Sequence, residues 1–420
     1  MVTTLFVAFF VMLFLGIPIA VCLGIASLVA LHFGSHLPFL ILPQKLFNGV
    51  NSFPFMAIPL FLLAGNIMAE AKISDRLVAL AAILVGRYPG GLAHMSTGAS
   101  AFFGAISGSA PATTAAIGSI MIPAMVKRGY GKGYSAAVVA ASGALGLIIP
   151  PSLTMVVFGV MAGASIGDMF LCGIVPGVLI SIALIGLNYF IARKRGYMPE
   201  EPASGRRARA VVKDSLIALV MPLIILGGIY SGAFTATESA AVASLYGLIV
   251  GFVVYRNLSL RSLYHILKNT AESSALIMFL MGTANLFGYI ITAEQVPQGF
   301  ANYVLAITQS PTVAMFMVLG LLLVVGCFLD NVAALVLLTP TLMGMVDAMN
   351  IDVVYFGVFT IIALAVGQFT PPVGLNLFIA SNIAGEKFET VSRRALPYIA
   401  AYVLMLVLFI LFPGLLTVFH

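Results

Sequence analysis

Long apolar stretches, separated by short polar ones, occupy almost the whole chain. Runs of about 20 residues, the length with which a helix crosses the hydrocarbon core of a bilayer, recur from Leu5 to Phe412. They lack the strict alternation of an outer-membrane strand, so they predict helices. The first run, Leu5 to Leu31, has no basic segment before it and no small-residue cleavage site, and we expect a retained single span there.

Composition agrees with lipid as the solvent of this chain. Hydrophobic residues make up 61% and charged residues 8% of the 420 positions, and no water-soluble surface can be built from that mixture. The net charge of +6 comes largely from one loop, since seven of the 20 Lys and Arg fall between Arg193 and Lys213. Flanked by apolar spans and without aromatic neighbours, this loop is typical of a cytoplasmic membrane loop and not of a nucleic-acid-binding patch, so no nucleic acid is expected as a partner.

Two largely apolar segments do not fit the length of ordinary spans. Residues 88–126 carry basic residues at both ends, and the two apolar arms are each too short for a full crossing. A re-entrant hairpin buried in protein fits this pattern, and two short full spans are the alternative. Residues 311–346 repeat the layout around Asp330 and Asn331, but with Glu294 and Asp347 beyond their ends, so this hairpin is expected to enter from the outer side. The remaining runs predict nine spans, with a cytoplasmic N-terminus and a periplasmic C-terminus at His420.

Each hairpin is followed by a Pro-Pro pair, at Pro150 and at Pro371, which are separated by 371 − 150 = 221 residues. Residues 1–192, with a hairpin at 88–126 and a broken helix at 134–164, thus resemble residues 232–420, with a hairpin at 311–346 and a broken helix at 353–384. Residues 193–231 supply the basic loop and one linking span, which inverts the second half. The expected fold is an all-α membrane protein with an inverted repeat, two re-entrant hairpins and two broken helices.

Consecutive prolines break a helix for a physical reason, because they lack donors and their rings clash with the preceding turn. The carbonyls left unpaired before Pro150 and Pro371 are hard oxygen ligands suited to a small cation, while nearby helix N-termini attract an anion. A simple packing kink is the alternative interpretation. The recurrence of the pair beside both hairpins favours a binding site.

Four ordered motifs match a known family. They are FGAISGSAPATTAAIGSIMIPAM at 103–125, IPPS at 149–152, GIYSGAFTATESAAVA at 228–243 and TPPVGLNL at 370–377. With them the chain resembles the large membrane subunit, the DctM-type permease, of tripartite ATP-independent periplasmic (TRAP) transporters, which the family places in the bacterial inner membrane. Ala236 departs from the family, which often has proline there.

The resemblance implies a non-enzymatic importer that couples organic-acid uptake to sodium ions by an elevator motion. It also implies two partners on separate chains, a small four-helix membrane subunit and a periplasmic solute-binding protein. By position, the sodium ligands would be Ser107, Ser109, Gly146, Pro150, Gly326, Asp330, Gly367 and Thr370. The residues that face the solute would be Ser109, Thr113, Ser152, Asn331, Gly374 and Asn376.

Two acidic residues within apolar segments require separate interpretations. Asp330 is costly at the depth of a hairpin tip unless a cation or a polar partner compensates its charge, and the alternative is a tip that reaches water. Glu238 lies about one turn inside its span, where helix capping or a scaffold hydrogen bond is expected.

The first hairpin reads Ser-Ala-Pro-Ala-Thr-Thr at 109–114, which favours a C4-dicarboxylate, with sialic acid possible. A stand-alone sodium/dicarboxylate symporter is one rival. An intramembrane enzyme is the other, disfavoured because the five histidines show no ligand spacing.

Overall fold

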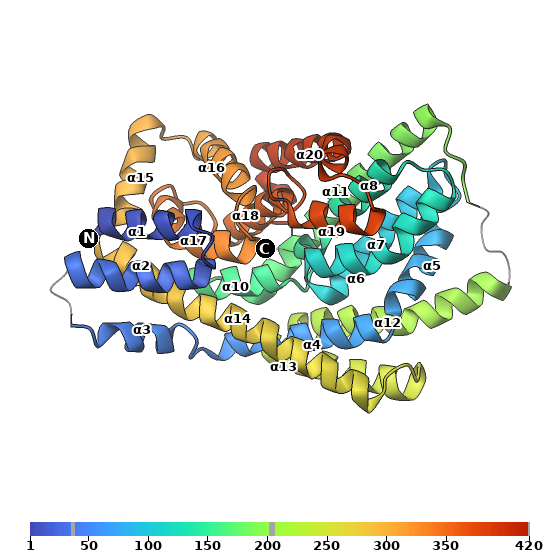
Figure 1. The fold of residues 1–420 in the computed structure, drawn as a ribbon, viewed down its shortest axis with the longest axis horizontal. Helices are drawn as coiled ribbons and strands as arrows, with labels where there is room; N and C mark the ends of the chain where they lie inside the picture. Colours follow the sequence, from blue (N-terminus) through green and yellow to red (C-terminus); the bar gives the residue numbers. More distant parts are fainter. Residues whose placement is uncertain (35–37, 201–205, 419–420) are drawn as a thin grey trace.

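In the computed structural model, the placement of residues 1–34, 38–200 and 206–418 is described, and these residues form helices and loops without a strand. The prediction of an all-α chain is therefore confirmed for them (Figure 1). The helices are α1 (Val2–Phe14), α2 (Ile19–Gly34), α3 (Ile41–Asn48), η1 (Phe53–Met56), α4 (Ala57–Glu70), α5 (Ile73–Val85), α6 (Gly91–Ser107), α7 (Ala110–Lys127), α8 (Lys132–Gly143), α9 (Leu145–Ile148), α10 (Leu153–Ala162), α11 (Ile166–Arg195), α12 (Arg206–Tyr230), α13 (Ala236–Ile249), η2 (Val250–Val254), α14 (Leu260–Ala293), α15 (Val296–Ile307), α16 (Pro311–Gly326), α17 (Asn331–Ala348), α18 (Val353–Gly367), α19 (Leu375–Ala384), α20 (Phe388–Leu411) and η3 (Pro413–Leu415).

Seven helices in the described residues are long and apolar enough to cross a bilayer, and an eighth span results if α8 and α9 are joined to α10 across their 41° bend. The prediction of nine spans is not reproduced by helix length. The main reason is that the first apolar run is not one helix. A second reason is that α18 and α19 are each too short to cross alone, since residues 368–374 separate them. In the other direction, the seven include α17, an arm of the second hairpin that was predicted to be too short for a crossing.

The first predicted span, Leu5 to Leu31, is wrong as a single helix. Gly16 adopts a φ of +78°, a left-handed conformation, and Pro18 follows two residues later, so α1 ends at Phe14. The chain then turns back and α2 packs along α1 (Figure 1). Glycine adopts this φ without strain and proline cannot continue the hydrogen-bond ladder, and these two properties explain the turn.

This extra reversal changes where the chain begins. The α-amino group of Met1 lies 3.9 Å from the Glu294 carboxylate, so both residues are at the same end of the molecule. The predicted topology placed Met1 inside and Glu294 outside, and this opposite placement is wrong. His420, predicted to be periplasmic, lies outside the described residues, as do residues 201–205 of the basic loop.

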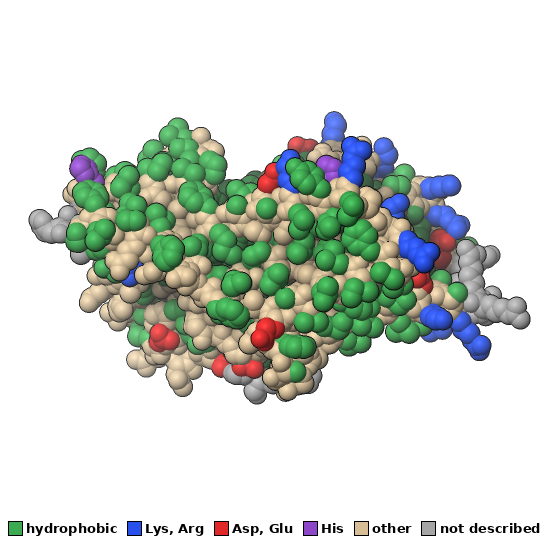
Figure 2. Space-filling view, turned by 90° about the horizontal axis from the view of Figure 1, so that it is seen from below, with side chains coloured by type: hydrophobic (Ala, Val, Ile, Leu, Met, Phe, Trp, Pro, Cys, Tyr) green, Lys and Arg blue, Asp and Glu red, His purple; other side chains and the backbone are tan. Residues whose placement is uncertain are grey.

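Lys and Arg side chains gather toward one end of the long axis (Figure 2). We call this the basic end, and it includes Arg128 and Arg193 to Arg195. The opposite end, which carries Glu294 and Asp347, is called the acidic end. The amphipathic helices α5 and α15 lie toward the basic and the acidic end, respectively (Figure 1). Acidic side chains also occur at the basic end, where Asp214 and Glu200 pair with Arg76 and Arg128. The asymmetry is therefore one of Lys and Arg, which is what the positive-inside rule describes in a membrane protein.

The two hairpins point toward each other from these ends. Helices α6 and α7 are joined at Gly108 and Ser109, and α16 and α17 at residues 327–330. In Figure 1 the first pair lies to the right and the second to the left. Helices α7 and α17 begin and end at positions that are 221 residues apart, since 331 − 110 and 348 − 127 are both 221.

Both Pro-Pro pairs interrupt a helix, as the sequence indicated. Helix α9 ends at Ile148 before the Pro150–Pro151 peptide, and α18 ends at Gly367 before the Pro371–Pro372 peptide; both Pro-Pro bonds are cis.

Glu238 forms a capping box with Thr235 at the start of α13, in which its carboxylate accepts a hydrogen bond from the Thr235 amide at 2.8 Å. The capping role predicted for Glu238 is therefore confirmed.

Candidate substrate and ion site

The two hairpin tips meet in a cavity of about 290 Å³. Its walls come from both tips, from the start of α10, from the residue after α18, and from apolar side chains of α4 and α14. The residues that line it are Leu62, Gly108, Ser109, Pro111, Leu147, Leu153, Thr154, Leu276, Ile277, Leu280, Asp330, Asn331, Val332 and Gln368. Helices α7, α10 and α17 all begin at this cavity, so three helix N-termini direct their positive dipole ends toward it.

The first tip is rich in hydroxyl groups and carries no charge. The Ser107 and Thr113 hydroxyls lie 2.9 Å apart, and the Thr113 hydroxyl also donates to the Ser109 carbonyl at 2.8 Å. Gly146 of α9 packs directly on this group. A Cβ at Gly146 would lie 2.5 Å from Thr113 Oγ1 and 2.7 Å from the Ser109 carbonyl oxygen, so only glycine permits the contact.

The second tip presents a carboxylate and two amides. Asp330 caps α17, and its carboxylate accepts a hydrogen bond from the Val332 amide at 3.1 Å. Gln368 donates from Nε2 to Asn331 Oδ1 at 2.8 Å. The remaining amide atoms, Asn331 Nδ2 and Gln368 Oε1, are buried and have no protein partner. Buried polar atoms without a partner are costly, so this pair is expected to bind a solute or an ion.

Each tip is fixed to its broken helix in the same way. The Leu153 amide donates to the Gly108 carbonyl at 3.4 Å, and the Val373 amide donates to the Cys327 carbonyl at 3.3 Å. Gly367 packs on Gly326 so closely that a Cβ at Gly367 would lie 2.1 Å from the Gly326 carbonyl oxygen. Both tips are thus held by backbone contacts to the residues around a Pro-Pro break.

The structure divides the predicted site residues into two groups. Ser109, Asp330 and Asn331 line the cavity. The others lie behind it or beside the breaks, and they are Ser107, Thr113, Gly146, Pro150, Ser152, Gly326, Gly367, Thr370, Gly374 and Asn376.

Three of the residues behind the cavity use their polar groups locally. The Ser152 hydroxyl lies 2.8 Å from that of Thr154, the Thr370 hydroxyl donates to the Val366 carbonyl at 2.7 Å, and Asn376 donates from Nδ2 to the Ala140 carbonyl at 3.1 Å. None of the three lines the cavity, although Asn376 Oδ1 is buried without a protein partner.

Sequence reasoning missed Gln368 and Thr154, which also line the cavity. Gln368 follows Gly367 directly and lies two residues before the second Pro-Pro motif, TPPVGLNL. An amide inside a long apolar run was the available signal, because such a residue is expensive in lipid without a partner.

The donors around the tips suit a small hard cation. Carbonyl oxygens, hydroxyls and the Asp330 carboxylate are oxygen ligands, and the contacts of Gly146 and Gly367 bring the backbone close to them. Within the described ranges, no three His, Cys, Asp or Glu side chains group as a transition-metal site would require. These oxygen donors are chemically compatible with a small hard cation such as sodium.

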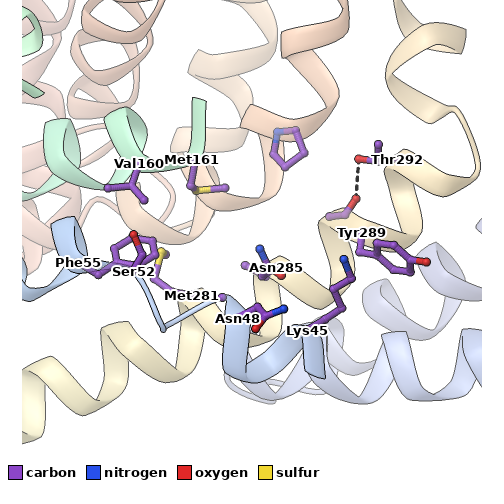
Figure 3. Close-up of a pocket in the computed structure, with 14 residues that line it drawn as sticks. Lys45, Asn48, Ser52, Phe55, Val160, Met161, Met281, Asn285, Tyr289 and Thr292 are labelled. Carbon is purple, nitrogen blue, oxygen red and sulfur yellow. Dashed lines mark hydrogen bonds between the residues drawn. The ribbon is translucent and has the colours of Figure 1, made fainter. Parts of the chain in front are cut away.

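A second cavity, of about 480 Å³, lies toward the acidic end (Figure 3). Lys45 and Asn48 of α3 lie beside Asn285 and Tyr289 of α14 on one side of it, and Val160 and Met161 of α10 form part of an apolar wall on the other. The Lys45 ammonium lies 4.1 Å from the centroid of the Tyr289 ring.

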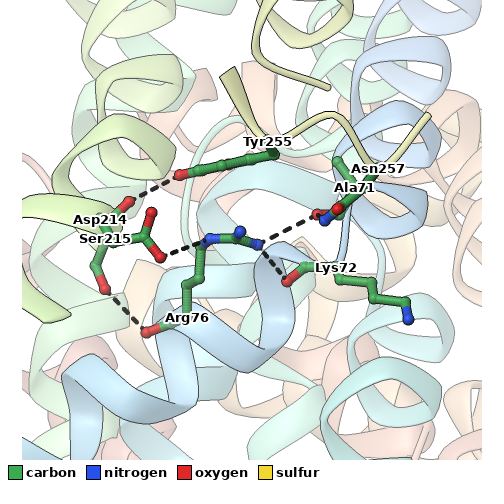
Figure 4. Close-up of polar contacts among 7 residues, drawn as sticks. All are labelled: Ala71, Lys72, Arg76, Asp214, Ser215, Tyr255 and Asn257. Atoms are coloured by element: carbon green, nitrogen blue, oxygen red, sulfur yellow. Dashed lines mark hydrogen bonds and ion pairs between the residues drawn. The ribbon is translucent and has the colours of Figure 1, made fainter. Parts of the chain in front are cut away.

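At the other end of the molecule, α5 is tied to α12 by a polar cluster (Figure 4). Arg76 donates from Nε to the Asp214 carboxylate at 2.8 Å and lies 3.6 Å from the centroid of the Tyr255 ring. Burial raises the pKa of Tyr255 to about 12, so its phenol remains protonated and donates to the Asp214 carbonyl at 2.7 Å. The Ser215 hydroxyl donates to the Arg76 carbonyl at 3.0 Å. These contacts fix the connector that leads into the first hairpin.

Comparison with protein families gives one match along nearly the whole chain. The model of the DctM component of tripartite ATP-independent periplasmic transporters matches residues 6–415. The chain is 45% identical over 405 residues to the isethionate TRAP transporter permease protein DctMQ of Oleidesulfovibrio alaskensis, with 96% of this chain and 64% of that protein covered. It is 38% identical over 402 residues to the sialic acid TRAP transporter large permease protein SiaM of Vibrio cholerae, with 96% and 94% covered.

Another relative, the C4-dicarboxylate TRAP transporter large permease protein DctM of Rhodobacter capsulatus, is 34% identical over 413 residues, with 95% of this chain and 94% of that protein covered. Among solved structures, the YdaH transporter of Alcanivorax borkumensis has a TM-score of 0.64 at 15% identity, with 90% of this chain and 88% of that chain covered. MtrF of Neisseria gonorrhoeae has a TM-score of 0.59 at 13% identity, with 95% and 93% covered. At these identities the two structures establish similarity of fold alone.

Proposed function

The chain belongs to the DctM family of tripartite ATP-independent periplasmic transporters, and we propose that it imports an organic acid together with sodium ions through a bacterial inner membrane. The observation that carries this proposal is the cavity between the two hairpin tips, in which the Asp330 carboxylate and unpartnered buried amide atoms lie beside helix N-termini. Such a cavity offers a carboxylate to a cation and positive dipole ends to an acid.

The basic end would face the cytoplasm by the positive-inside rule. The acidic end, with Met1 and Glu294, then faces the periplasm, and the first hairpin enters from the cytoplasmic side. The inverted relation of residues 1–192 to residues 232–420 is supported by the 221-residue offset that α7 and α17 share.

Transport would proceed by an elevator motion. Both tips and both broken helices would move as one body against α13, α14 and α4, which packs on both of them. The cluster of Arg76 and Asp214 would keep α5 attached to α12 during this motion, so that bending is confined to the turn between α5 and α6.

The cavity lining includes no Lys or Arg, so the acid would be held by dipoles, hydroxyls, amides and bound sodium. A volume of about 290 Å³ favours a compact acid. A C4-dicarboxylate fits the sequence prediction, while the relative with 45% identity is named for isethionate, a small sulfonate.

Two partners are proposed from the family, a small membrane subunit and a periplasmic solute-binding protein. Because the chain spans 64% of the DctMQ relative, a further part of that protein has no counterpart in the matched region.

Reconstitution tests the function. The chain is placed in proteoliposomes with a candidate small subunit and binding protein, an inward sodium gradient is imposed, and uptake of labelled succinate, isethionate and N-acetylneuraminic acid is measured. We expect accumulation of one acid that requires the gradient and the binding protein. Accumulation by this chain alone would instead support the stand-alone symporter, and the absence of sodium dependence would contradict the proposed coupling.

A further inference from the structure

We propose that the cavity at the acidic end is a second binding station for the transported acid, in which Lys45 together with the Asn48 and Asn285 amides binds the acidic group before it reaches the hairpin tips (Figure 3). This inference rests on the proposed function and adds a site on α3 and α14 to it. The chemical class of the ligand is a small carboxylate or sulfonate.

Lys45 is an exception to the charge distribution of the molecule. It contacts Tyr289, which lies five residues before Glu294 at the acidic end. On the face that Figure 2 shows, the Lys and Arg side chains gather mostly toward the opposite, basic end. A single cation placed against the positive-inside pattern has no topological role, so its charge is available for an anionic ligand.

The two amides beside Lys45 are unusual for their positions. Asn285 lies within the apolar helix α14 and is exposed to the cavity, on the same side as Asn48 (Figure 3). Neither amide has a hydrogen-bond partner among the described residues. Polar side chains in membrane helices usually pair with each other or mark a solute pathway, and these two point toward the same space.

Three helices connect this cavity with the one at the tips. Along α14 the lining passes from Leu276 and Leu280 to Asn285 and Tyr289, along α10 from Thr154 to Met161, and along α17 from Val332 to Pro340. Each step covers five to nine residues, or about 8 to 13 Å at the rise of a helix. All three helices run toward the acidic end, so the two cavities follow one another in the same direction.

The composition of the lining fits a small organic acid. One wall carries Lys45 and the two amides, and the other carries Val160, Met161 and Pro340. Polar groups on one side and apolar groups on the other would orient the acid with its charged group toward α3. The volume, about 480 Å³ against about 290 Å³ at the tips, admits the same solute with water around it.

A structural role for Lys45 is the competing explanation, since its contact with the Tyr289 ring could simply hold α3 on α14. The test must therefore detect the charge of Lys45 inside the cavity, and not only the loss of a packing contact.

Thiol labelling provides this readout. A cysteine is introduced as Asn285→Cys into the full chain, in a background with Cys327→Ala; the other cysteines, Cys22 and Cys172, are buried. The rate of modification is compared for an anionic reagent, sulfonatoethyl methanethiosulfonate, and its cationic counterpart, trimethylammonioethyl methanethiosulfonate. The comparison is repeated with Lys45→Gln and Lys45→Arg, and with Tyr303→Cys, an exposed position on α15, as the control.

We expect the ratio of anionic to cationic rates at position 285 to fall roughly tenfold with Lys45→Gln, to be kept with Lys45→Arg, and to be unchanged at position 303. Succinate or isethionate at 10 mM, against sodium chloride of equal ionic strength, should slow labelling at position 285 at least threefold only when residue 45 is basic. An unchanged ratio, or no protection by any acid of the panel, would overturn the station.

Uptake by the reconstituted complex separates this inference from the proposed function. Lys45→Gln should raise KM for the imported acid about fivefold, with kcat within twofold, and Lys45→Arg should restore KM. An unchanged KM would show that Lys45 does not bind the acid during transport. That result would contradict the proposed second binding station but leave the proposed function intact. No uptake of any acid by the unmodified complex would count against the function itself.

Discussion

The two hairpin tips share one backbone arrangement but carry different chemistry. At the first tip, hydroxyls and carbonyls bond to one another, and Ser109 caps α7 through a long contact of 3.4 Å to the Ala112 amide. At the second tip, Asp330 occupies the equivalent position at the start of α17, and the neighbouring amides of Asn331 and Gln368 keep unpartnered atoms. The positions of Ser109 and Asp330 differ by 330 − 109 = 221 residues.

This difference indicates that the two tips have different roles although their backbones are alike. The hydroxyls of the first tip already hydrogen-bond to protein groups, so an ion would stabilise that tip little. The carboxylate of the second tip lies near apolar walls, where its charge is costly unless a cation binds to it. We therefore expect the first tip to provide shape and weak contacts, and the second to provide most of the sodium dependence.

The largest effect on stability is expected where a substitution disrupts the close backbone contact between a hairpin tip and its broken helix. Gly367→Ala would place a Cβ 2.1 Å from a backbone oxygen of Gly326, and the backbone cannot move aside, so we expect a loss of about 3 kcal/mol or more in unfolding free energy. Gly146→Ala would place its Cβ 2.5 Å from the Thr113 hydroxyl and 2.7 Å from the Ser109 carbonyl oxygen, and because both contacts are longer than the one at Gly367 the loss should be smaller. Thermal unfolding of the purified protein in detergent measures both.

Gly320→Ala on α16 is the matched control, because nothing lies within 4 Å of its added Cβ. It should leave stability unchanged or slightly raised. Equal destabilisation by Gly320→Ala and Gly367→Ala would show that the close contact of Gly367 with Gly326 does not explain the loss of stability.

An intermediate effect is expected from the charge at the second tip. Asp330→Asn keeps the size and capping ability of the side chain, so the protein should still insert in the membrane. The sodium concentration for half-maximal uptake should rise at least tenfold, equivalent to about 1.4 kcal/mol. Ser109→Ala, which retains the backbone carbonyl, should change that concentration less than threefold. Sodium titration of uptake measures both, and a larger effect of Ser109→Ala would reverse the assigned roles.

The smallest effect is expected from the amide that supports the second tip. Gln368→Leu removes the donor to Asn331 Oδ1, so KM for the acid should rise about threefold to fivefold, worth roughly 1 kcal/mol, while the sodium titration stays unchanged. Initial uptake rates at several acid concentrations provide the measurement. Gln298→Leu, an exposed change on α15, should have no effect. A shift in sodium dependence would assign Gln368 to the ion instead.

Sequence predicted the local geometry best where the chemistry of the backbone is unusual. The breaks at Pro150 and Pro371 and the tips at Ser109 and Asp330 follow from residues that cannot continue a helix. The prediction of a single span over the first apolar run was wrong because the run is uniformly apolar, and hydropathy does not distinguish one span from two short helices joined by a turn. The Gly16-Ile-Pro18 sequence indicated the turn, but the prediction relied on the length of the apolar run.

The functional site could be predicted only in part from the sequence, for a different reason. Ser109, Asp330 and Asn331 lie at tips, which periodicity and motifs identify. Gln368 and Lys45 were missed because they lie beside residues far away in the chain, Asn331 and Asn285, respectively. Contacts between helices that are distant in sequence leave no spacing pattern. The amide of Gln368 inside an apolar run was a local signal that it needs a partner, but that signal did not identify the partner.

The proximity of Met1 to Glu294 has a practical consequence for work on this protein. A reporter domain fused ahead of Met1 would emerge at the end opposite Arg193 to Arg195, so under the proposed orientation it would have to fold in the oxidising periplasm. The fusion would also remove the charge that faces Glu294 at 3.9 Å. A fluorescent protein that matures only in the cytosol would therefore stay dark in this position, whereas an alkaline phosphatase fusion would be active.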